Sequence, residues 1–484
     1  MNDKLQTFRQ NIRGKRVSVI GLGISNMPVI DFLLDCGASV VGRDRKDAAA
    51  LGEAAHSLAD KGVALRLGED YLSDIREDVI FKAPGIRPDL PQFLAAQENG
   101  CALTSEMEVF LALCPAQIFA VTGSDGKTTT TTLIYTLLSE QCKKEGGSRR
   151  VFVGGNIGRP LLPEIADITE DDFVVLELSS FQLQAMKTGR GIQPWPHVAC
   201  ITNVTPNHLN WHTDMDEYTD AKTQIFRSQP RGGRLVLNFE NELTRAMAAE
   251  SGCHVTFFTS KRQLRDNFCG ADAAIFEQDG AIVFSADAGE EPFPILNTED
   301  ILIPGRHNVE NFMTAIAAVR GYVDADTITE VAKTFGGVEH REEYVCTRNG
   351  VKYYNSSIDS SPTRTIAALH AFKQKLIVIL GGADKGVPFD SLAEPLAKHA
   401  KAVILTGAAR EKIADALTAS EEFRASGVPV ITEPDFCAAI DAARDAACAG
   451  DIVILSPACT SFDAFPNFEV RGRTFKAHVM RYED

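Results

Sequence analysis

Short apolar runs alternate with alanine-rich or amphipathic stretches along most of this chain, and no other feature restricts the possible fold as strongly. Five of these runs span residues 172–178, 198–204, 375–382, 401–407 and 451–458. Strands that alternate with helices form parallel sheets covered by helices on both faces. The pattern therefore predicts an α/β fold, with ligand-binding side chains beyond the carboxyl ends of the strands.

The N-terminal stretch KRVSVIGLGISNMPVIDFLLDCGASVVGRDRK predicts a strand, a helix and a second strand. These elements are expected at residues 16–20, 27–36 and 38–42. Gly21 and Gly23 form the turn, but the third glycine of a dinucleotide-binding fingerprint is replaced by Asn26, which disfavours a dehydrogenase. Asp44 follows the second strand, where such folds contact a ribose. A nucleotide-type ligand and a plain βαβ turn both remain open.

A second glycine turn lies in AVTGSDGKTTTTTL, between an apolar run and a predicted helix. A helix N-terminus presents backbone N–H groups that favour an anion, and Gly123 and Gly126 let the backbone close around a phosphate. Lys127 can reach terminal phosphates, and the Thr128 hydroxyl can bind Mg²⁺. Val121 stands where the usual phosphate loop has glycine, so this is a shortened variant; the alternative is a simple strand–helix turn.

Polar groups follow the neighbouring predicted strands. Glu177 lies within an apolar strand, which favours a ligand or catalytic role over an edge position in water. His208 and His212 have the spacing of a helical zinc pair, but Pro206 and the turn-forming residues around it predict a loop. Together, Thr128, Glu177 and His208 outline a Mg²⁺–ATP site.

Composition limits the classes of function. The 484 residues are enough for roughly three domains of about 150 residues each. A net charge of −16 argues against a nucleic-acid partner, and no apolar run approaches the length of a membrane span. The polar N-terminus predicts no secretory signal, and eleven scattered cysteines are typical of free thiols in a reducing cytoplasm.

Eight motifs carry a family resemblance when taken in order. They are GSDGKTT, VGGNIGRP, ELSSFQL, NHLNWH, AK, PGRHNVEN, EHR and SPACTSFDAFPNFEVRG. With them the chain resembles, over nearly its whole length, the Mur ligases, which add amino acids to the UDP-linked peptidoglycan precursor. GLGISN, APGI, GNIGRP and ELSSFQL are most similar to the branch that adds D-glutamate.

The resemblance implies three domains, each built on a mostly parallel sheet. They are a Rossmann-like precursor-binding domain (1–115), a central phosphate-loop ATPase-like domain (116–339) and a Rossmann-like C-terminal ligase domain (340–484). It also implies that ATP phosphorylates the carboxylate of UDP-N-acetylmuramoyl-L-alanine, and that the D-glutamate amine then displaces phosphate from the acyl phosphate. We expect a cytoplasmic monomer with no nucleic-acid or membrane partner.

The same resemblance assigns roles to individual residues. The catalytic residues are Lys127, Glu177, His208 and Lys222. Two Mg²⁺ ions are held by Thr128, Glu177, His208 and Lys222, the last as a carbamylated lysine. ATP is bound by Gly123, Ser124, Asp125, Gly126, Lys127, Thr128, Thr129, Asn308, Asn311 and Arg341. The UDP precursor is bound by Ser25, Asp44, Arg45, Gly85 and Asn156. D-glutamate is bound by Ser461 and Phe468.

One segment departs from the family pattern. Many relatives carry an aspartate and a lysine in an NDSKATN-like turn, but this chain reads NSSIDSSPTRT, with Ser356 and Ile358 at those positions. D-glutamate brings two carboxylates, so a cation must replace the lysine. Arg364, at a predicted helix start, is the first candidate and Lys385 the second.

Some of these residues also have a purely structural interpretation, and alternative functions remain open. Lys222 alone would be a solvated helix lysine, Asn308 and Asn311 could cap a helix, and Phe468 could belong to a core. A sister ligase that adds another amino acid is one alternative function. A nucleotide-binding protein that has lost catalysis is another, although the intact catalytic set argues against it.

Overall fold

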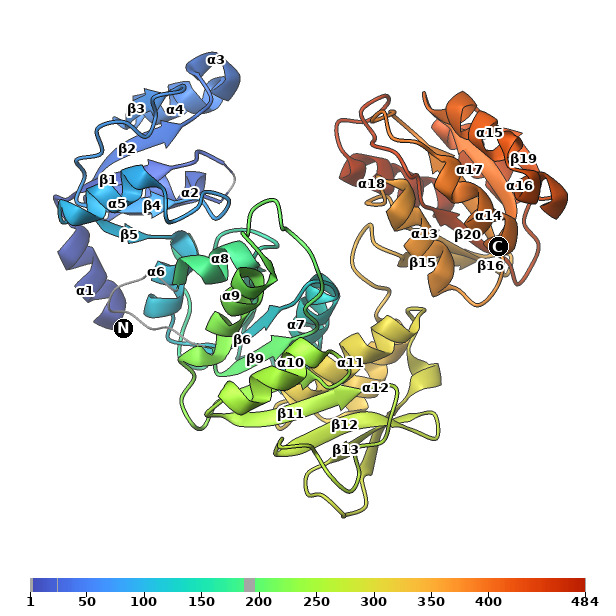
Figure 1. The fold of residues 1–484 in the computed structure, drawn as a ribbon, viewed down its shortest axis with the longest axis horizontal. Helices are drawn as coiled ribbons and strands as arrows, with labels where there is room; N and C mark the ends of the chain where they lie inside the picture. The colour runs from blue at the N-terminus through green and yellow to red at the C-terminus, as the bar shows by residue number, and fades with distance from the viewer. Residues whose placement is uncertain (1–2, 24, 187–195, 484) are drawn as a thin grey trace. The chain divides into compact units, whose positions relative to one another are not determined.

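The computed structural model describes residues 3–23, 25–186 and 196–483. The chain forms two compact units (Figure 1): Met1–Thr298 with Glu310–Val331, and Glu299–Val309 with Ala332–Asp484. Its strands form three mostly parallel sheets with helices packed on them, which confirms the α/β class. The predicted boundaries at residues 115 and 339 stay a prediction.

The first sheet has five parallel strands in the order β3-β2-β1-β4-β5. These are β1 (Arg16–Ile20), β2 (Ser39–Asp44), β3 (Ala64–Leu67), β4 (Val79–Lys82) and β5 (Ala102–Thr104). The helices of this region are α1 (Asp3–Ile12), α2 (Met27–Asp35), α3 (Ala48–Leu51), α4 (Glu53–Asp60), α5 (Pro91–Glu98) and α6 (Glu106–Leu113). The strand order reverses between β1 and β4, and ligands of such sheets bind at that point.

The second sheet has nine strands in the order β14-β13-β12-β11-β10-β9-β6-β8-β7, and only its β12–β13–β14 edge is antiparallel. Its strands are β6 (Gln117–Thr122), β7 (Val151–Gly155), β8 (Phe173–Glu177), β9 (Val198–Ile201), β10 (Arg234–Asn238), β11 (His254–Thr259), β12 (Ala273–Gln278), β13 (Ala281–Ser285) and β14 (Phe293–Asn297). The α-helices around it are α7 (Lys127–Lys144), α8 (Ser180–Met186), α9 (Met215–Arg227), α10 (Glu242–Met247), α11 (Arg306–Val319) and α12 (Ala325–Thr334). Single 3₁₀ turns are η1 (Leu162–Glu164), η2 (Ala248–Glu250) and η3 (Thr298–Asp300).

The third sheet has six strands in the order β15-β16-β20-β17-β18-β19, parallel except for β15 against β16. Its strands are β15 (Glu343–Arg348), β16 (Val351–Asn355), β17 (Leu376–Gly381), β18 (Ala400–Thr406), β19 (Val430–Thr432) and β20 (Ile452–Leu455). Its helices are α13 (Pro362–Ala371), η4 (Asp390–Leu392), α14 (Ala393–His399), α15 (Arg410–Ala419), α16 (Glu421–Ser426), α17 (Phe436–Asp445) and α18 (Phe468–Val479).

The central strand β17 is apolar on both faces because helices cover both. Val378 and Leu380 belong to one buried cluster with residues of α13, α14 and α15, whereas Ile377 and Ile379 belong to another with residues of α17 and α18. Alternate residues of a strand face opposite sides of the sheet. This explains why the strands appear in the sequence as continuous apolar runs rather than as alternating ones.

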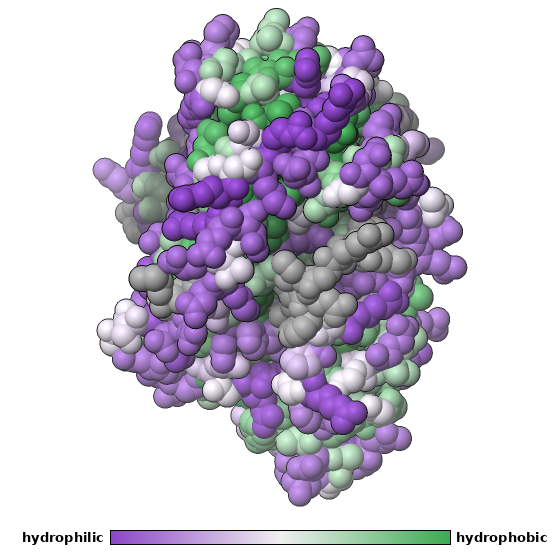
Figure 2. All heavy atoms as spheres, turned by 90° about the vertical axis from the view of Figure 1, so that its left-hand side faces the viewer, coloured by the Kyte–Doolittle hydropathy of each residue, from purple (hydrophilic) through white to green (hydrophobic). Residues whose placement is uncertain are grey.

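One face of the molecule is largely polar (Figure 2). On the face drawn in Figure 2, hydrophilic residues predominate, and hydrophobic ones gather mainly toward its upper end. Within the described residues, no helix is both long and apolar enough to cross a membrane.

Candidate functional site

The glycine–lysine turn connects β6 to α7, as the sequence predicts. Gly123 has φ +149° and Gly126 has φ +78°, conformations that disfavour other residues. A Cβ at Gly123 would lie 1.9 Å from Thr202 Oγ1, and one at Gly126 would lie 2.6 Å from Asn311 Oδ1. Both glycines are therefore required by backbone conformation and by close packing.

The segment that follows β9 fixes the shape of this turn. Ser124 N donates to Asn203 O at 2.9 Å, and Asp125 N donates to Asn203 Oδ1 at 2.9 Å. Thr202 Oγ1 donates to Asp125 O at 2.5 Å. The turn is thus preorganised by its neighbours. The Lys127 ammonium lies against it, donating to the carbonyls of Gly123 and Ser124 at 3.0 and 2.9 Å.

Glu177 is the last residue of β8, paired in register with Val121 of β6, so its carboxylate lies beside the turn. The side chain is buried, and Oε1 accepts a hydrogen bond from Asn156 Nδ2 at 2.7 Å. Oε2 is also buried and has no hydrogen-bond partner among the described residues. A buried carboxylate is costly unless it is paired. This oxygen therefore fits a bound cation such as Mg²⁺.

Lys222 projects from α9 toward the same turn. Its side chain is 1% exposed, and Nζ donates to Gly123 O at 2.8 Å and lies 4.5 Å from the centre of the Tyr218 ring. Burial, with the nearby charge of Lys127, holds the pKa of Lys222 well below its usual value. The structure thus excludes the solvated-lysine interpretation.

His208 and His212 lie in the loop before α9, as the turn-forming residues predict. His208 is exposed and has φ +55°, and partial desolvation with the nearby charges of Lys127 and Lys222 lowers the pKa of its imidazole. A neutral imidazole can bind a metal. His212 instead lies buried with Nε2 2.9 Å from Ser180 Oγ.

Predicted magnesium ligands thus gather at the end of β6, but only half of them are His, Cys, Asp or Glu side chains. Within the described residues, no group of three His, Cys, Asp or Glu side chains forms a metal cluster. The predicted set contains two such side chains, Glu177 and His208, together with Thr128 and Lys222. Glu177 is the one anionic side chain in this predicted set.

Among the predicted precursor-binding residues, Asp44 and Arg45 lie at and just after the end of β2, whereas Ser25 and Gly85 follow β1 and β4, the strands on either side of the switch point. A cavity of about 260 Å³ opens there, lined partly by Ser25, Asn26, Lys82, Glu106, Asn156 and Gln182. It thus joins the turn after β1 to Asn156, the hydrogen-bond partner of Glu177. Burial lowers the pKa of Lys82 to about 8 and raises that of Glu106 to about 7.

Asp44 and Asn26 have structural contacts that the sequence does not reveal. Asp44 Oδ2 accepts a hydrogen bond from Leu22 N at 2.7 Å, and Oδ1 accepts one from Lys46 N at 2.8 Å. The Asn26 amide donates to the carbonyls of Ile20 and Gly21 at 3.1 and 3.0 Å. Both side chains hold the turn after β1, and Arg45 beside them is exposed.

The two asparagines of α11 differ in their contacts. Asn311 Oδ1 accepts a hydrogen bond from Thr130 Oγ1 of α7 at 3.2 Å, so this side chain lies against the glycine turn. Asn308 Nδ2 donates to Pro304 O at 2.6 Å. Because α11 begins at Arg306, Asn308 lies inside the helix and is not its cap.

The predicted D-glutamate residues belong to the second compact unit. Arg364 lies in the first turn of α13, where Pro362 begins the helix, and donates to Ile358 O at 3.2 Å. Lys385 Nζ lies 3.4 Å from Ser360 Oγ of the same segment. Ser461 is buried.

One aromatic and one basic side chain, those of Phe468 and Arg341, complete the predicted set in this unit. Phe468 is half-buried, with its ring centre 5.8 Å from that of His340, and does not belong to a core cluster of the described residues. Arg341 follows His340 and donates its backbone N–H to Val338 O at 2.9 Å.

Several residues around the site were missed by sequence reasoning. The Tyr218 hydroxyl lies 2.9 Å from Ser124 Oγ, and its ring lies under Lys222. Thr202 and Asn203 shape the glycine turn, and Lys82 lines the cavity. No motif marks Tyr218 or Lys82, because each acts through contacts with residues distant in the chain.

Two family models and several curated proteins match this chain. The Mur ligase middle domain matches residues 121–319, and the Mur ligase glutamate ligase domain matches residues 340–459. A UDP-N-acetylmuramoylalanine–D-glutamate ligase of Acetivibrio thermocellus is 47% identical over 486 residues, covering 100% of both chains. Its namesake from Clostridium kluyveri is 46% identical over 481 residues, covering 99% of both chains.

A solved structure shows a similar fold. The UDP-N-acetylmuramate–alanine ligase of Thermotoga maritima superimposes with a TM-score of 0.55 at 18% identity, covering 96% of this chain and 99% of that one. Full-length identity near 46%, with both domain models matched in order, establishes the relationship. The chain belongs to the Mur ligase family.

Proposed function

We propose that this protein is an ATP-dependent ligase that joins D-glutamate to UDP-N-acetylmuramoyl-L-alanine in peptidoglycan precursor synthesis, releasing ADP and phosphate. The observation that carries the proposal is the buried Glu177 carboxylate, which has one hydrogen-bonded and one available oxygen beside a preorganised glycine–lysine turn. Relatives of similar length that bear this name support the choice of substrates.

The glycine turn would bind the ATP phosphates through its backbone N–H groups and the N-terminus of α7. Lys127 would neutralise charge that develops on the γ-phosphate as the alanine carboxylate attacks it. Asn311 would contact ATP from its position against the turn, with Asn308 and Arg341 as further contacts. The D-glutamate amine would then displace phosphate from the acyl phosphate.

Two Mg²⁺ ions would be held by Thr128, Glu177, His208 and carbamylated Lys222. When bound, these ions screen the phosphate charge. Lys222 is suited to carbamylation because a buried amine with a lowered pKa has a larger neutral fraction, and only the neutral amine attacks CO₂. The carbamate would exchange a buried cation for an anion beside the metal.

The remaining assignments concern the other two substrates. Ser25 and Asn156, which line the cavity at the first sheet, would bind the UDP precursor together with Asp44, Arg45 and Gly85. Arg364 would bind a D-glutamate carboxylate with help from the N-terminus of α13, and Lys385, Ser461 and Phe468 would complete the site. We also infer three domains divided near residues 115 and 339, a cytoplasmic location and a monomeric state.

Phosphate release with UDP-N-acetylmuramoyl-L-alanine and a panel of amino acids tests the proposal. Turnover should require both the precursor and D-glutamate, and L-glutamate should fail. Equal turnover with L-alanine or meso-diaminopimelate would assign the chain to a sister ligase. ATP binding with no turnover on any amino acid would indicate a protein that has lost catalysis.

A further inference from the structure

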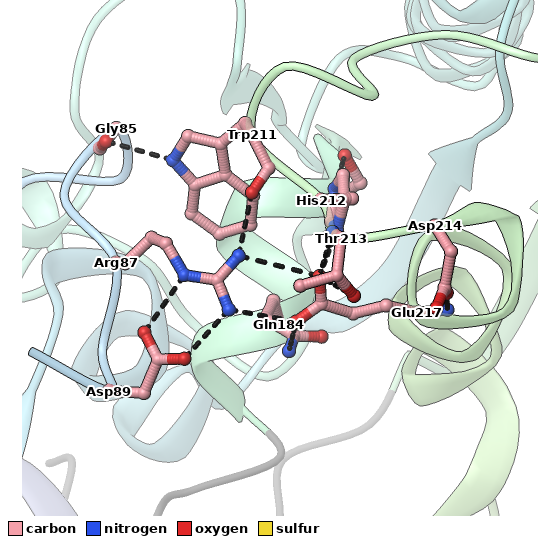
Figure 3. A network of polar contacts seen from close by, with 10 residues as sticks. Gly85, Arg87, Asp89, Gln184, Trp211, His212, Thr213, Asp214 and Glu217 are labelled. Atoms are coloured by element: carbon pink, nitrogen blue, oxygen red, sulfur yellow. Dashed lines mark hydrogen bonds and ion pairs between the residues drawn. The ribbon is translucent and has the colours of Figure 1, made fainter.

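Arg87, in the turn after β4, reaches from the first sheet to the loop and helix that carry His208 and Lys222 (Figure 3). Its guanidinium donates to Trp211 O at 2.6 Å and to Glu217 Oε1 at 2.9 Å. It also forms a two-point ion pair with Asp89, at 2.9 and 2.7 Å. One side chain thus joins two parts of the chain separated by more than one hundred residues.

A second contact connects the same two segments. Trp211 Nε1 donates to Gly85 O at 3.0 Å, and the Arg87 guanidinium carbon lies 5.1 Å from the centre of the Trp211 ring. Figure 3 shows the indole between Gly85 and the guanidinium. The turn at residues 85–87 therefore binds both the backbone and the side chain of Trp211.

Glu217 connects Arg87 to the loop before α9. Its carboxylate accepts a hydrogen bond from Thr213 N at 2.7 Å and another from Gln184 Nε2 of α8 at 3.2 Å. The hydrogen bonds from Arg87 are the largest cause of the lowered pKa of Glu217, so the carboxylate stays charged at neutral pH. His212 Nδ1 lies 3.7 Å away.

An aromatic cluster continues from Trp211 to His208. The Phe181 ring centre lies 4.5 Å from that of Trp211 and 4.9 Å from that of His208. His208 has a positive φ, a conformation that a non-glycine residue keeps only when surrounding contacts enforce it. A displacement of Trp211 would therefore be transmitted to the His208 ring through Phe181.

We propose that Arg87 is a positioning residue: it clamps the Gly85 turn to Trp211 and Glu217, so that a precursor bound along the first sheet meets His208 in a fixed register. This inference rests on the proposed function, in which Gly85 binds the precursor and His208 helps to hold the metal. Because the contacts of Arg87 are with Asp89, Trp211 and Glu217, it would act on the reaction only through those residues.

A purely structural ion pair is the competing explanation. Arg87 is 25% exposed and Asp89 is 53% exposed, and pairs of this kind contribute little to stability. The structural explanation predicts a small effect on stability and none on the chemical step. The positioning role predicts a loss of turnover from a protein that remains folded, because small misplacements of reacting groups lower rates strongly.

Four variants of the full chain separate these explanations. Arg87→Ala should lower kcat roughly 10- to 100-fold, with KM for ATP nearly unchanged. Arg87→Lys keeps the charge without the forked geometry and should recover part of kcat. Trp211→Phe keeps the ring and the carbonyl but loses the bond to Gly85, and should give an intermediate loss. Asp89→Asn is the matched control, because it weakens only the exposed partner, and should retain kcat.

Thermal melting of each variant accompanies the kinetics. Arg87→Ala with wild-type kcat, or a loss of kcat that follows thermal stability equally in all four variants, would overturn the positioning role. A wild-type chain that releases no phosphate with D-glutamate would overturn the proposed function instead. The two failures are therefore distinguishable.

Discussion

Arg471 of α18 offers a stability prediction whose size can be worked from its contacts. The side chain is 2% exposed, and its guanidinium donates to three carbonyl oxygens: Ser357 O at 2.8 Å, Cys459 O at 3.1 Å and Thr460 O at 3.1 Å. It also donates to Ser357 Oγ at 3.0 Å. These bonds join α18 to the two segments that contain Ile358 and Ser461.

Arg471→Met keeps most of the buried volume and removes every donor. Each buried carbonyl left without its donor costs about 1–3 kcal/mol. Part of this cost is offset because the variant no longer buries a charged guanidinium. That burial is unfavourable to the charge, since it lowers the pKa of Arg471 to about 10. We expect a net loss of about 3–5 kcal/mol in the free energy of unfolding of the second compact unit, a drop of roughly 6–20 °C in its melting temperature.

Chemical denaturation and calorimetry of the full chain measure this loss. Arg473→Met is the matched control, because Arg473 lies on the same helix but is exposed, and it should change stability by less than about 0.5 kcal/mol. At temperatures where Arg471→Met stays folded, KM for D-glutamate should rise more than KM for ATP. Equal stability of the two variants would refute the reasoning.

Four further predictions concern single side chains. Lys127→Ala should lower kcat by a factor on the order of 10², because it removes a charge matched to the transferred phosphoryl group. A near-normal steady-state rate would indicate that the turn has only a structural role. Lys222→Ala should be nearly inactive, with partial recovery in a short-chain carboxylate; a mutant as active as wild type would exclude the carbamate. Arg364→Ala should raise KM for D-glutamate roughly tenfold while KM for ATP changes little, and an unmoved D-glutamate KM would place the carboxylate elsewhere. Burial lowers the pKa of Lys82 to about 8 in the folded chain, so the unfolded chain binds this proton more tightly. The free energy of unfolding should therefore rise as the pH increases from about 8 toward 10.5. Lys82→Met should abolish that rise in denaturation curves, and an unchanged pH slope would contradict it.

The strands and the glycine turn were predictable because their signals are local. The run at residues 375–382 became β17, and the turn before Lys127 has the positive φ values that its glycines suggest. Strand ends differ by up to three residues, since hydrogen bonding to neighbours decides where pairing stops. β9 ends at Ile201 rather than Val204, and the side chains of Thr202 and Asn203 bind the glycine turn.

The candidate site was predictable mainly through motifs that resemble a family. Glu177 could be suspected from its apolar neighbours alone, but the burial of Lys222 could not, because a lysine on a polar helix is usually solvated. Tyr218 and Arg87 left no signal at all. Their partners lie 94 and 130 residues away in sequence, and only the folded chain brings them together.

Asp44 shows that a residue whose position predicts a ligand contact can instead have structural contacts. Its position after the second strand predicts contact with a ligand, yet both of its oxygens accept backbone hydrogen bonds of the turn. A carboxylate at a strand end can serve a turn, a ligand or both, and the sequence pattern is the same in each case.

Oxygen transfer from substrate to phosphate tests the central claim most directly. If the precursor carboxylate attacks the γ-phosphate and the amine then displaces phosphate, one carboxylate oxygen must leave with the phosphate. With both carboxylate oxygens of UDP-N-acetylmuramoyl-L-alanine labelled with ¹⁸O, mass spectrometry should find one ¹⁸O in each phosphate released and one in the new amide. Unlabelled phosphate, or label in AMP, would contradict carboxylate activation by phosphoryl transfer at this site.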